Sequence, residues 1–299
     1  MVEGGGWKVN TAGERSGRVT RSGESPVHDA CGPAGEWAGI DADSSTFHLP
    51  PSTRRLRGCP LQAAPSALAR GCVVIPAYRE ARFIGDLVRR VRSVIPDVFV
   101  VDDGSPDATA SAAGAAGATV LRHPVNRGKG AALETGLAQA RAGGFAFVVT
   151  MDGDGQHDPA ELARFLQAYR DGGAPVLVGN RFHDLARMPW LRRATNRAMS
   201  WLLSREMGQR VPDTQCGYRL FGREVLPWLS GGAATRYAAE SEVLLRLARR
   251  GVRIGCVPVT AIYGDERSKI NPLSDTVRFL RMLLRFHRQS RRRTAEGLL

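Results

Sequence analysis

Cysteine is scarce in this 299-residue sequence, and its five cysteines form no C-x-x-C pair. Cysteines scattered in this way are typical of a reduced chain and argue against a disulfide-stapled secreted domain. No run of about 18 apolar residues occurs, so we expect no transmembrane helix. A basic start followed by an apolar run is also missing, so no signal peptide is expected. These absences predict a cytoplasmic protein.

The residues up to about Ser66 lack the apolar periodicity of a helix or a strand. They are rich in Gly, Ser, Pro and Arg, a composition that does not bury enough apolar surface to fold. We interpret residues 1–66 as a disordered N-terminal tail or as an over-called start of the reading frame. A folded domain is expected over residues 67–271 and a basic amphipathic helix over residues 272–293.

From Gly71 onward, short apolar runs alternate with helical patterns. "GCVVIPAY" reads as a buried strand, and "EARFIGDLVRRVRSVI" follows with apolar residues at helical spacing. This alternation recurs along the chain and predicts an α/β fold with a mostly parallel central sheet flanked by helices. Ligands bind at the carboxyl ends of strands in such sheets. Three predicted strands end in polar clusters, at residues 102–103, 152–156 and 180–181, so we expect a site there.

The stretch "VVTMDGDGQHDPAEL" carries the densest of these clusters. Asp152, Asp154 and Gln156 are alternate residues, so their oxygens can face one point in an extended turn. Carboxylate and amide oxygens are the ligands that Mg²⁺ and Mn²⁺ prefer, usually together with substrate phosphates. An EF-hand is excluded because its glycine and its final glutamate are missing. The alternative is a polar turn that caps a helix, with Asp158 as N-cap and Pro159 in the first helical position.

Two further clusters are weaker signals on their own. Asp102 and Asp103 close a strand, where a carboxylate commonly binds the ribose or base of a nucleotide, although "DDGS" is also an ordinary turn. In "NRGKGAAL", glycines beside Arg127 and Lys129 at a helix start are suited to face a phosphate. The Walker spacing is absent, and a plain loop-to-helix junction fits this stretch equally well.

Six motifs in order give the sequence a family resemblance: "VVIPAYRE", "VVDDGSPDAT", "NRGKGAAL", "TMDGDGQHDP", "VGNRF" and "DTQCGYRLF". Together they resemble glycosyltransferase family 2, closest to its dolichyl-phosphate mannose synthase-like branch, over nearly all of residues 70–285. The resemblance implies a GT-A nucleotide-diphosphosugar transferase fold over residues 67–271. It also implies a nucleotide pocket lined by Pro76, Tyr78, Glu80 and Asp103.

The same resemblance assigns the metal and diphosphate site to Asp152, Asp154 and Gln156, with Arg181 beside the donor or acceptor phosphate. We therefore expect a metal-dependent, inverting transfer of a hexose from a nucleotide diphosphate sugar, of the GDP-mannose or UDP-glucose type, to a polyprenyl or dolichyl phosphate. The ion, Mg²⁺ or Mn²⁺, and basic side chains would neutralise the leaving diphosphate.

The choice of acceptor is indicated by the few acids in the motif "DTQCGYRLF". Only Asp213 there is a candidate base, whereas an acceptor phosphate is already ionised near neutral pH and needs little help from one. Glu240 and Glu242 are alternative bases, or plain helix-surface or capping acids. A phosphate acceptor asks for cations instead. The predicted ones are Arg193, Arg219, Arg267 and Lys269.

The net charge of +13 is concentrated partly in the segment "TVRFLRMLLRFHRQSRRR". Its arginines recur at spacings of three and four on one helical face, and Phe279, Met282, Leu283 and Phe286 share the other. Such a basic amphipathic helix predicts peripheral binding at the inner membrane face. The alternative is a helix that packs on the body of the protein and leaves its arginines in water.

Three other functions compete with this interpretation. A family 2 enzyme with a saccharide acceptor would keep the same donor and metal. A nucleotidyltransferase would use the same fold, but its Gly-rich, Arg-bearing loop is replaced here by "PAYREARF". A nucleic-acid-binding protein would explain the positive charge, but no helix-turn-helix, RNA-recognition or zinc pattern occurs, so we expect no nucleic acid as partner.

Overall fold

The computed structural model describes residues 69–182, 190–229, 237–260, 262, 277 and 279–287. The predicted tail over residues 1–66 lies outside this part of the chain, as do Arg267 and Lys269. Within it, no helix is long and apolar enough to cross a membrane.

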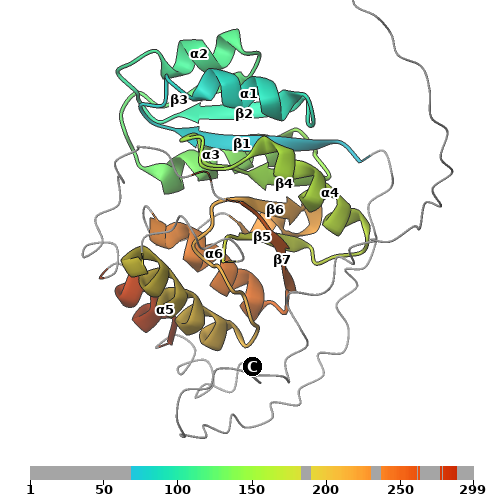
Figure 1. Ribbon diagram of the computed structural model, residues 1–299, viewed down its shortest axis with the longest axis vertical. Coiled ribbons are helices and arrows are strands. Elements are labelled where there is room, and N and C mark those ends of the chain that lie inside the picture. The colour runs from blue at the N-terminus through green and yellow to red at the C-terminus, as the bar shows by residue number, and fades with distance from the viewer. Residues whose placement is uncertain are drawn as a thin grey trace, which may run out of the picture.

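The centre of the fold is a seven-stranded sheet in the order β3-β2-β1-β4-β6-β5-β7 (Figure 1). The strands are β1 (Gly71–Ala77), β2 (Asp97–Asp102), β3 (Thr119–Arg122), β4 (Phe147–Thr150), β5 (Val176–Asn180), β6 (Arg219–Gly222) and β7 (Ile254–Pro258). β6 runs antiparallel to both of its neighbours, β4 and β5, and the other pairings are parallel. The predicted mostly parallel α/β fold is confirmed.

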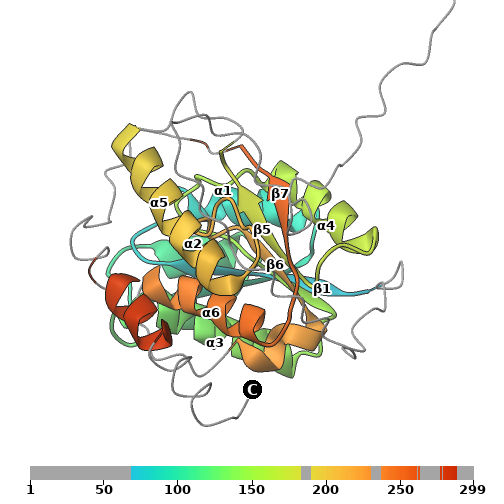
Figure 2. The ribbon, with the colours of Figure 1, turned by 90° about the horizontal axis from the view of Figure 1, so that it is seen from below.

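Helices cover both faces of this sheet. They are α1 (Ile84–Arg92), α2 (Thr109–Ala115), α3 (Lys129–Ala142), α4 (Leu162–Arg170), α5 (Trp190–Met207) and α6 (Tyr237–Arg249), with 3-10 turns η1 (Pro159–Glu161) and η2 (Arg223–Trp228). In Figure 2, α3 and α6 lie along one face of the sheet, and α1 and α4 lie on the other.

The inner strand β1 shows why the sheet needs helices on both sides. All seven of its residues are buried, so it reads as a continuous apolar run rather than as an alternating one. α3 approaches it closely because Gly136 has no side chain: a Cβ there would lie 2.3 Å from Cγ1 of Val74. α1 covers the opposite face with the apolar stripe formed by Ile84, Leu87, Val88 and Val91.

The topology brings the ends of several strands to one edge of the sheet. Four of the strands run in the same direction: β1, β2, β4 and β5. β6 lies between β4 and β5 and runs in the opposite direction. The residues after β4 and β5 and the residues just before β6 therefore meet at this edge. The sequence had not predicted that "YRLFG" contains a strand, so the contribution of residues 213–218 to the edge is a finding of the structure.

Residues 279–287 are helical, and the side of this helix formed by Phe279, Met282, Leu283 and Phe286 is buried in the core. The guanidinium of Arg249 in α6 lies 4.4 Å from the centre of the Phe286 ring. The apolar side therefore packs on the body of the protein, as the alternative interpretation stated. Membrane contact through this helix stays a prediction that rests on its exposed residues, which include Arg281 and Arg285.

Candidate active site

The loop after β4 holds the acidic cluster in a compact turn. Oδ1 of Asp154 accepts a hydrogen bond from the amide of Gln156 at 3.0 Å, and the amide of Asp152 donates to Nδ1 of His157 at 3.2 Å. At the end of the loop, Oδ1 of Asp158 accepts from the amide of Ala160. Asp158 is thus the N-cap, as predicted. The other two acids of the loop, Asp152 and Asp154, do not cap the helix.

Gly217 leaves room for the carboxylate of Asp152 in the position that it occupies. A Cβ on Gly217 would lie 2.8 Å from either carboxylate oxygen of Asp152, a distance that side chains do not adopt. The hydroxyl of Thr150 donates to the carbonyl of Gly217 at 3.0 Å and holds the two segments together. The "CGY" sequence before β6 is therefore part of the acidic site.

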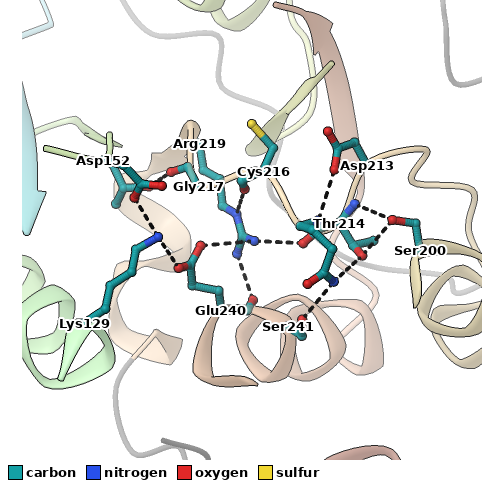
Figure 3. Close-up of polar contacts among 12 residues, drawn as sticks. Lys129, Asp152, Ser200, Asp213, Thr214, Cys216, Gly217, Arg219, Glu240 and Ser241 are labelled. Atoms are coloured by element: carbon teal, nitrogen blue, oxygen red, sulfur yellow. Dashed lines mark hydrogen bonds and ion pairs between the residues drawn. The ribbon is translucent and has the colours of Figure 1, made fainter. Parts of the chain in front are cut away.

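Lys129 connects the acidic loop to α6 (Figure 3). Its Nζ lies 2.6 Å from Oδ1 of Asp152 and 2.6 Å from Oε1 of Glu240. Burial alone would lower the pKa of Lys129, but the charges of Asp152 and Glu240 outweigh burial and raise it. The ammonium group therefore stays charged and partly neutralises the acids around it.

The two loop acids have opposite pKa shifts. Burial would raise the pKa of Asp152, but the charge of Lys129, assisted by His157, lowers it to about 2. Burial and the negative charge of Asp152 raise the pKa of Asp154. The two carboxylates are close enough to repel one another, and Lys129 makes its ion pair with Asp152, whereas its charge acts more weakly on Asp154.

This donor set fits a divalent cation that also binds substrate phosphates. The described residues contain no group of three His, Cys, Asp or Glu side chains suited to a metal. Asp152 and Asp154 supply two carboxylates, and Gln156 is half-buried two residues further on. Mg²⁺ commonly takes one or two carboxylates and completes its shell with water and phosphate oxygens. A cation here would remove the repulsion between the two acids.

Arg181, at the end of β5, is held by Asp213 in a two-point ion pair. Nε and an Nη of Arg181 lie 2.7 and 3.0 Å from the two carboxylate oxygens of Asp213, and the backbone amide of Arg181 also donates to Asp213. Asp213 is 1% exposed. This geometry makes Asp213 a positioning residue for Arg181 and argues against the predicted role as a base.

Arg219 does not have the position predicted for an acceptor-binding residue. It is 2% exposed, and its guanidinium donates to the carbonyls of Cys216, Glu240 and Thr214 at 2.8, 2.8 and 3.0 Å. All three bonds lie inside the protein, so Arg219 fastens the segment before β6 to α6 instead (Figure 3). Of the other predicted acceptor cations, Arg193 is half-buried on α5.

Asp103, predicted in the nucleotide pocket, organises the loop that precedes Lys129. It is 3% exposed, and its oxygens accept from the amides of Arg127 and Gly128 at 2.9 and 2.7 Å. His123 approaches it with Nδ1 at 2.7 Å from Oδ1. His123 was not predicted, since a histidine after a short strand gives no sign of its partner.

The other predicted nucleotide-binding residues follow one another at the end of β1. Pro76 belongs to the strand, Tyr78 is half-buried just beyond it, and Glu80 is 8% exposed where the chain turns towards α1. The carbonyl of Pro76 would lie 3.1 Å from a Cβ on Gly153, so this segment packs directly against the acidic loop. Their contact with a nucleotide stays a prediction.

Comparisons with known proteins identify the family of this chain. A family model described as "Glycosyl transferase family 2" matches residues 72–227. A polyprenol monophosphomannose synthase from Mycolicibacterium smegmatis is 32% identical over 204 residues, which cover 64% of this chain and 77% of that protein. A UDP-N-acetylglucosamine–dolichyl-phosphate N-acetylglucosaminyltransferase from Methanococcus voltae is 30% identical over 215 residues, which cover 64% and 86%.

The fold is also found among solved structures. Glucosyl-3-phosphoglycerate synthase from Mycobacterium tuberculosis, crystallised with Mn²⁺, uridine diphosphate and glucosyl-3-phosphoglycerate, matches with a TM-score of 0.58 at 22% identity. The match covers 74% of this chain and 80% of that one. It confirms the predicted GT-A type fold.

Proposed function

Because the chain belongs to glycosyl transferase family 2, we propose that this glycosyltransferase moves a hexose from a nucleotide diphosphate sugar to a polyprenyl phosphate. The observation that carries the proposal is the placement of Arg181, locked by Asp213, at the same edge of the sheet as Asp152 and Asp154. One side of the site thus offers acids suited to a metal–diphosphate group, and the other offers a fixed guanidinium suited to a phosphate. Relatives named for transfer to polyprenyl and dolichyl phosphates support this choice of acceptor.

The donor would bind over the acidic loop. Asp152, Asp154 and Gln156 would hold Mg²⁺ or Mn²⁺, whose charge would favour departure of the nucleoside diphosphate. Lys129 lies against Asp152 and adds a second positive charge at the start of α3. α3 begins at Lys129, so the positive end of its helix dipole also favours an anion here.

The three acids predicted as possible bases are paired or buried, and Glu242 is 6% exposed. Asp213 is engaged by Arg181, and Glu240 is engaged by Lys129 and Arg219. A saccharide hydroxyl would need one of these acids to take its proton in the transition state. A phosphate is already ionised, so it can attack the anomeric carbon opposite the leaving group and invert it. This difference favours the polyprenyl phosphate over a saccharide acceptor.

The test is a transfer assay with purified protein, Mn²⁺ or Mg²⁺, and a panel of labelled GDP- and UDP-linked hexoses. A short polyprenyl phosphate, the matching polyprenol, a disaccharide and 3-phosphoglycerate serve as acceptors. We expect label in the organic phase only with the polyprenyl phosphate. Label on the disaccharide or on 3-phosphoglycerate, with none on the lipid, would overturn the proposed acceptor.

A matched pair of variants links the assay to the site. Arg181→Gln removes the guanidinium that Asp213 positions, and Arg164→Gln removes an arginine that is exposed on α4. We expect only Arg181→Gln to raise the KM for polyprenyl phosphate or to abolish transfer. Equal activities of the two variants would contradict a role for Arg181 at the acceptor.

A further inference from the structure

The exposed face of α5 has an unusual composition for the surface of a protein. Two tryptophans and a leucine there are largely in water: Trp190 is 78% exposed, Leu191 59% and Trp201 51%. Together with the other exposed residues on this side they form what we term the outer face of α5. Its members are Trp190, Leu191, Ala194, Arg197, Ala198, Trp201 and Arg205. The members of the outer face are apolar or positive; Glu206, an exposed acid that follows Arg205 on α5, lies 3.4 Å from His287 of the C-terminal helix and is not one of them.

The opposite side of α5 is bonded to the segment that shapes the active site. Oγ of Ser200 accepts from the amide of Thr214 at 3.0 Å, and Ser204 exchanges hydrogen bonds with the backbone of Val211. Thr214 directly follows Asp213, which holds Arg181. Figure 3 shows Ser200, Thr214 and Asp213 side by side. The helix is therefore fixed relative to Arg181.

The outer face also reaches the strand end at which Arg181 lies. The guanidinium of Arg197 stands 5.7 Å from the centre of the Phe182 ring, and Phe182 is the residue after Arg181. Further along the helix, Arg205 lies 5.8 Å from the Trp201 ring. A surface in contact with the outer face would consequently lie beside the acceptor side of the site.

We propose that the outer face of α5 docks on an anionic phospholipid surface and brings Arg181 to the phosphate of a lipid-linked acceptor. The proposal rests on the proposed function for its account of the acceptor, but the docking itself is measured without one. Tryptophan rings favour the membrane–water interface, and arginines place their stems along apolar groups while the guanidinium meets lipid phosphates. Arg197 and Arg205 make the face complementary to a negative surface, and the neighbouring acid Glu206 lies against His287.

This assignment differs from the one made from the sequence. The apolar side of helix 279–287 packs in the core, and its outward residues include Leu280 and Leu284, 44% and 57% exposed, but no tryptophan. His287 lies 3.4 Å from Glu206, so this helix adjoins the C-terminal end of α5. The outer face of α5 flanks the active site, whereas the C-terminal helix adjoins the far end of α5.

The experiment measures binding of full-length protein to vesicles of phosphatidylcholine with and without phosphatidylglycerol, in the absence of sugar donor. We expect Arg197→Gln with Arg205→Gln to weaken binding to the anionic vesicles about thirtyfold. Each arginine near such a surface contributes about fivefold to sixfold in affinity, and the two contributions multiply. Arg141→Gln with Arg170→Gln removes two exposed arginines from α3 and α4 and is the matched charge control. If both double variants lose the same amount of vesicle affinity, the net charge of the protein explains the binding and the proposal is overturned.

The tryptophans give a second, independent measurement. Lipids brominated along their acyl chains are expected to quench the fluorescence of the wild-type protein, and Trp190→Phe with Trp201→Phe is expected to remove most of that quenching while the fold persists. Unquenched wild-type fluorescence on bound vesicles would contradict the proposal. So would a wild-type dimer that becomes monomeric in Trp190→Ala with Trp201→Ala, because the outer face would then join two copies of this chain.

Transfer assays separate this proposal from the proposed function. A short, water-soluble polyprenyl phosphate is expected to be used equally by the wild type and by the Arg197→Gln, Arg205→Gln variant, whereas a long acceptor embedded in vesicles is used poorly by the variant. If the wild type transfers to neither acceptor, the proposed function fails and the vesicle measurements still decide the docking.

Discussion

Nζ of Lys129 lies 2.6 Å from Oδ1 of Asp152. The ammonium group of this lysine therefore contacts an acid that we assign to the metal site. In Lys129→Met, Asp152 and Glu240 would face one another without it. We expect the free energy of unfolding to fall by about 2 kcal/mol in chelator. This is below the ~3–5 kcal/mol of a fully buried pair, because the two side chains keep 20% and 27% of their exposure. Urea unfolding measures the effect.

The metal provides the control for this variant. Mn²⁺ is expected to restore much of the lost stability in Lys129→Met, since it supplies positive charge to the same acids. Lys129→Arg keeps the charge and is expected to unfold near the wild-type midpoint. An unchanged midpoint of Lys129→Met in chelator would show that the ion pair contributes nothing to the fold.

Asp154→Asn is expected to separate metal binding from folding. Burial and the charge of Asp152 raise the pKa of Asp154, so a neutral side chain relieves repulsion and the melting temperature does not fall. Loss of a ligand is expected to weaken metal-dependent binding of a nucleoside diphosphate by more than ~100-fold, given that removing even an outer partner of a ligand costs ~10–100-fold. Calorimetry with and without Mn²⁺ measures this, and full metal-dependent binding by the variant would remove Asp154 from the site.

The polar clusters at the strand ends were predictable because they depend on residues that are close together in the sequence. A buried strand, a turn and a helix follow one another within about twenty residues, and parallel strands bring their carboxyl ends to one edge. The alternation of apolar runs therefore predicted that Asp103, Asp152 and Arg181 would lie at one edge of the sheet. β6 was missed because four residues that begin with a buried arginine show no strand alternation.

The partners of the site residues were not predictable in the same way. His123 with Asp103, and Glu240 with Lys129, are contacts between segments that only the folded sheet brings together. The same limit explains Arg219: its charge suggested a phosphate ligand, whereas three backbone carbonyls compensate for its burial. Helical periodicity likewise identified the apolar side of helix 279–287 but not what covers it.

Asp103→Ala is expected to affect folding as well as nucleotide binding. Removing its carboxylate leaves the amides of Arg127 and Gly128 and the ring of His123 without their acceptor. Loss of hydrogen bonds to a charged group costs about 1.5–3 kcal/mol of unfolding free energy. Chemical denaturation tests this against Asp86→Ala, whose carboxylate is exposed on α1. Weaker nucleotide binding at full stability would instead place Asp103 in direct contact with the ligand.

The pH dependence of stability is expected to carry a contribution from His157. Burial lowers its pKa from 6.5, while the charges of Asp152 and Asp154 act in the opposite direction. Its Nδ1 accepts from the amide of Asp152, which protonation at that atom would prevent. The unfolded chain therefore takes up the proton more readily, so this contribution is present above pH 6.5 and is lost as pH falls below it.

Melting temperatures between pH 7.5 and pH 5, measured in chelator, test this sign. The wild type is expected to lose more stability over that range than His157→Gln, in which the titrating ring is gone. Parallel profiles for the two proteins, or a wild type that gains stability on acidification relative to the variant, would rule out the contribution.

Deletion of residues 1–66 is expected to leave folding and turnover unchanged. The segment lacks the apolar pattern of a core element, and the first strand begins later, at Gly71. Melting temperature and kcat of the shortened chain measure the effect. A marked drop in either would show that the segment contributes to the fold or to the site.

The place of β6 in the sheet has a consequence for how the chain is made. β4 and β5 are consecutive strands but do not pair; β6, synthesised later, joins them. Until residues 219–222 have left the ribosome, each of these strands has an open edge, and such edges invite aggregation. The residues that emerge immediately before β6 include Asp213 and Gly217, which position Arg181 and make room for Asp152. The joining of β4 to β5 through β6 and the arrival of Asp213 and Gly217 at the edge of the site therefore depend on one stretch of the chain, and a nascent chain that stops short of it has neither.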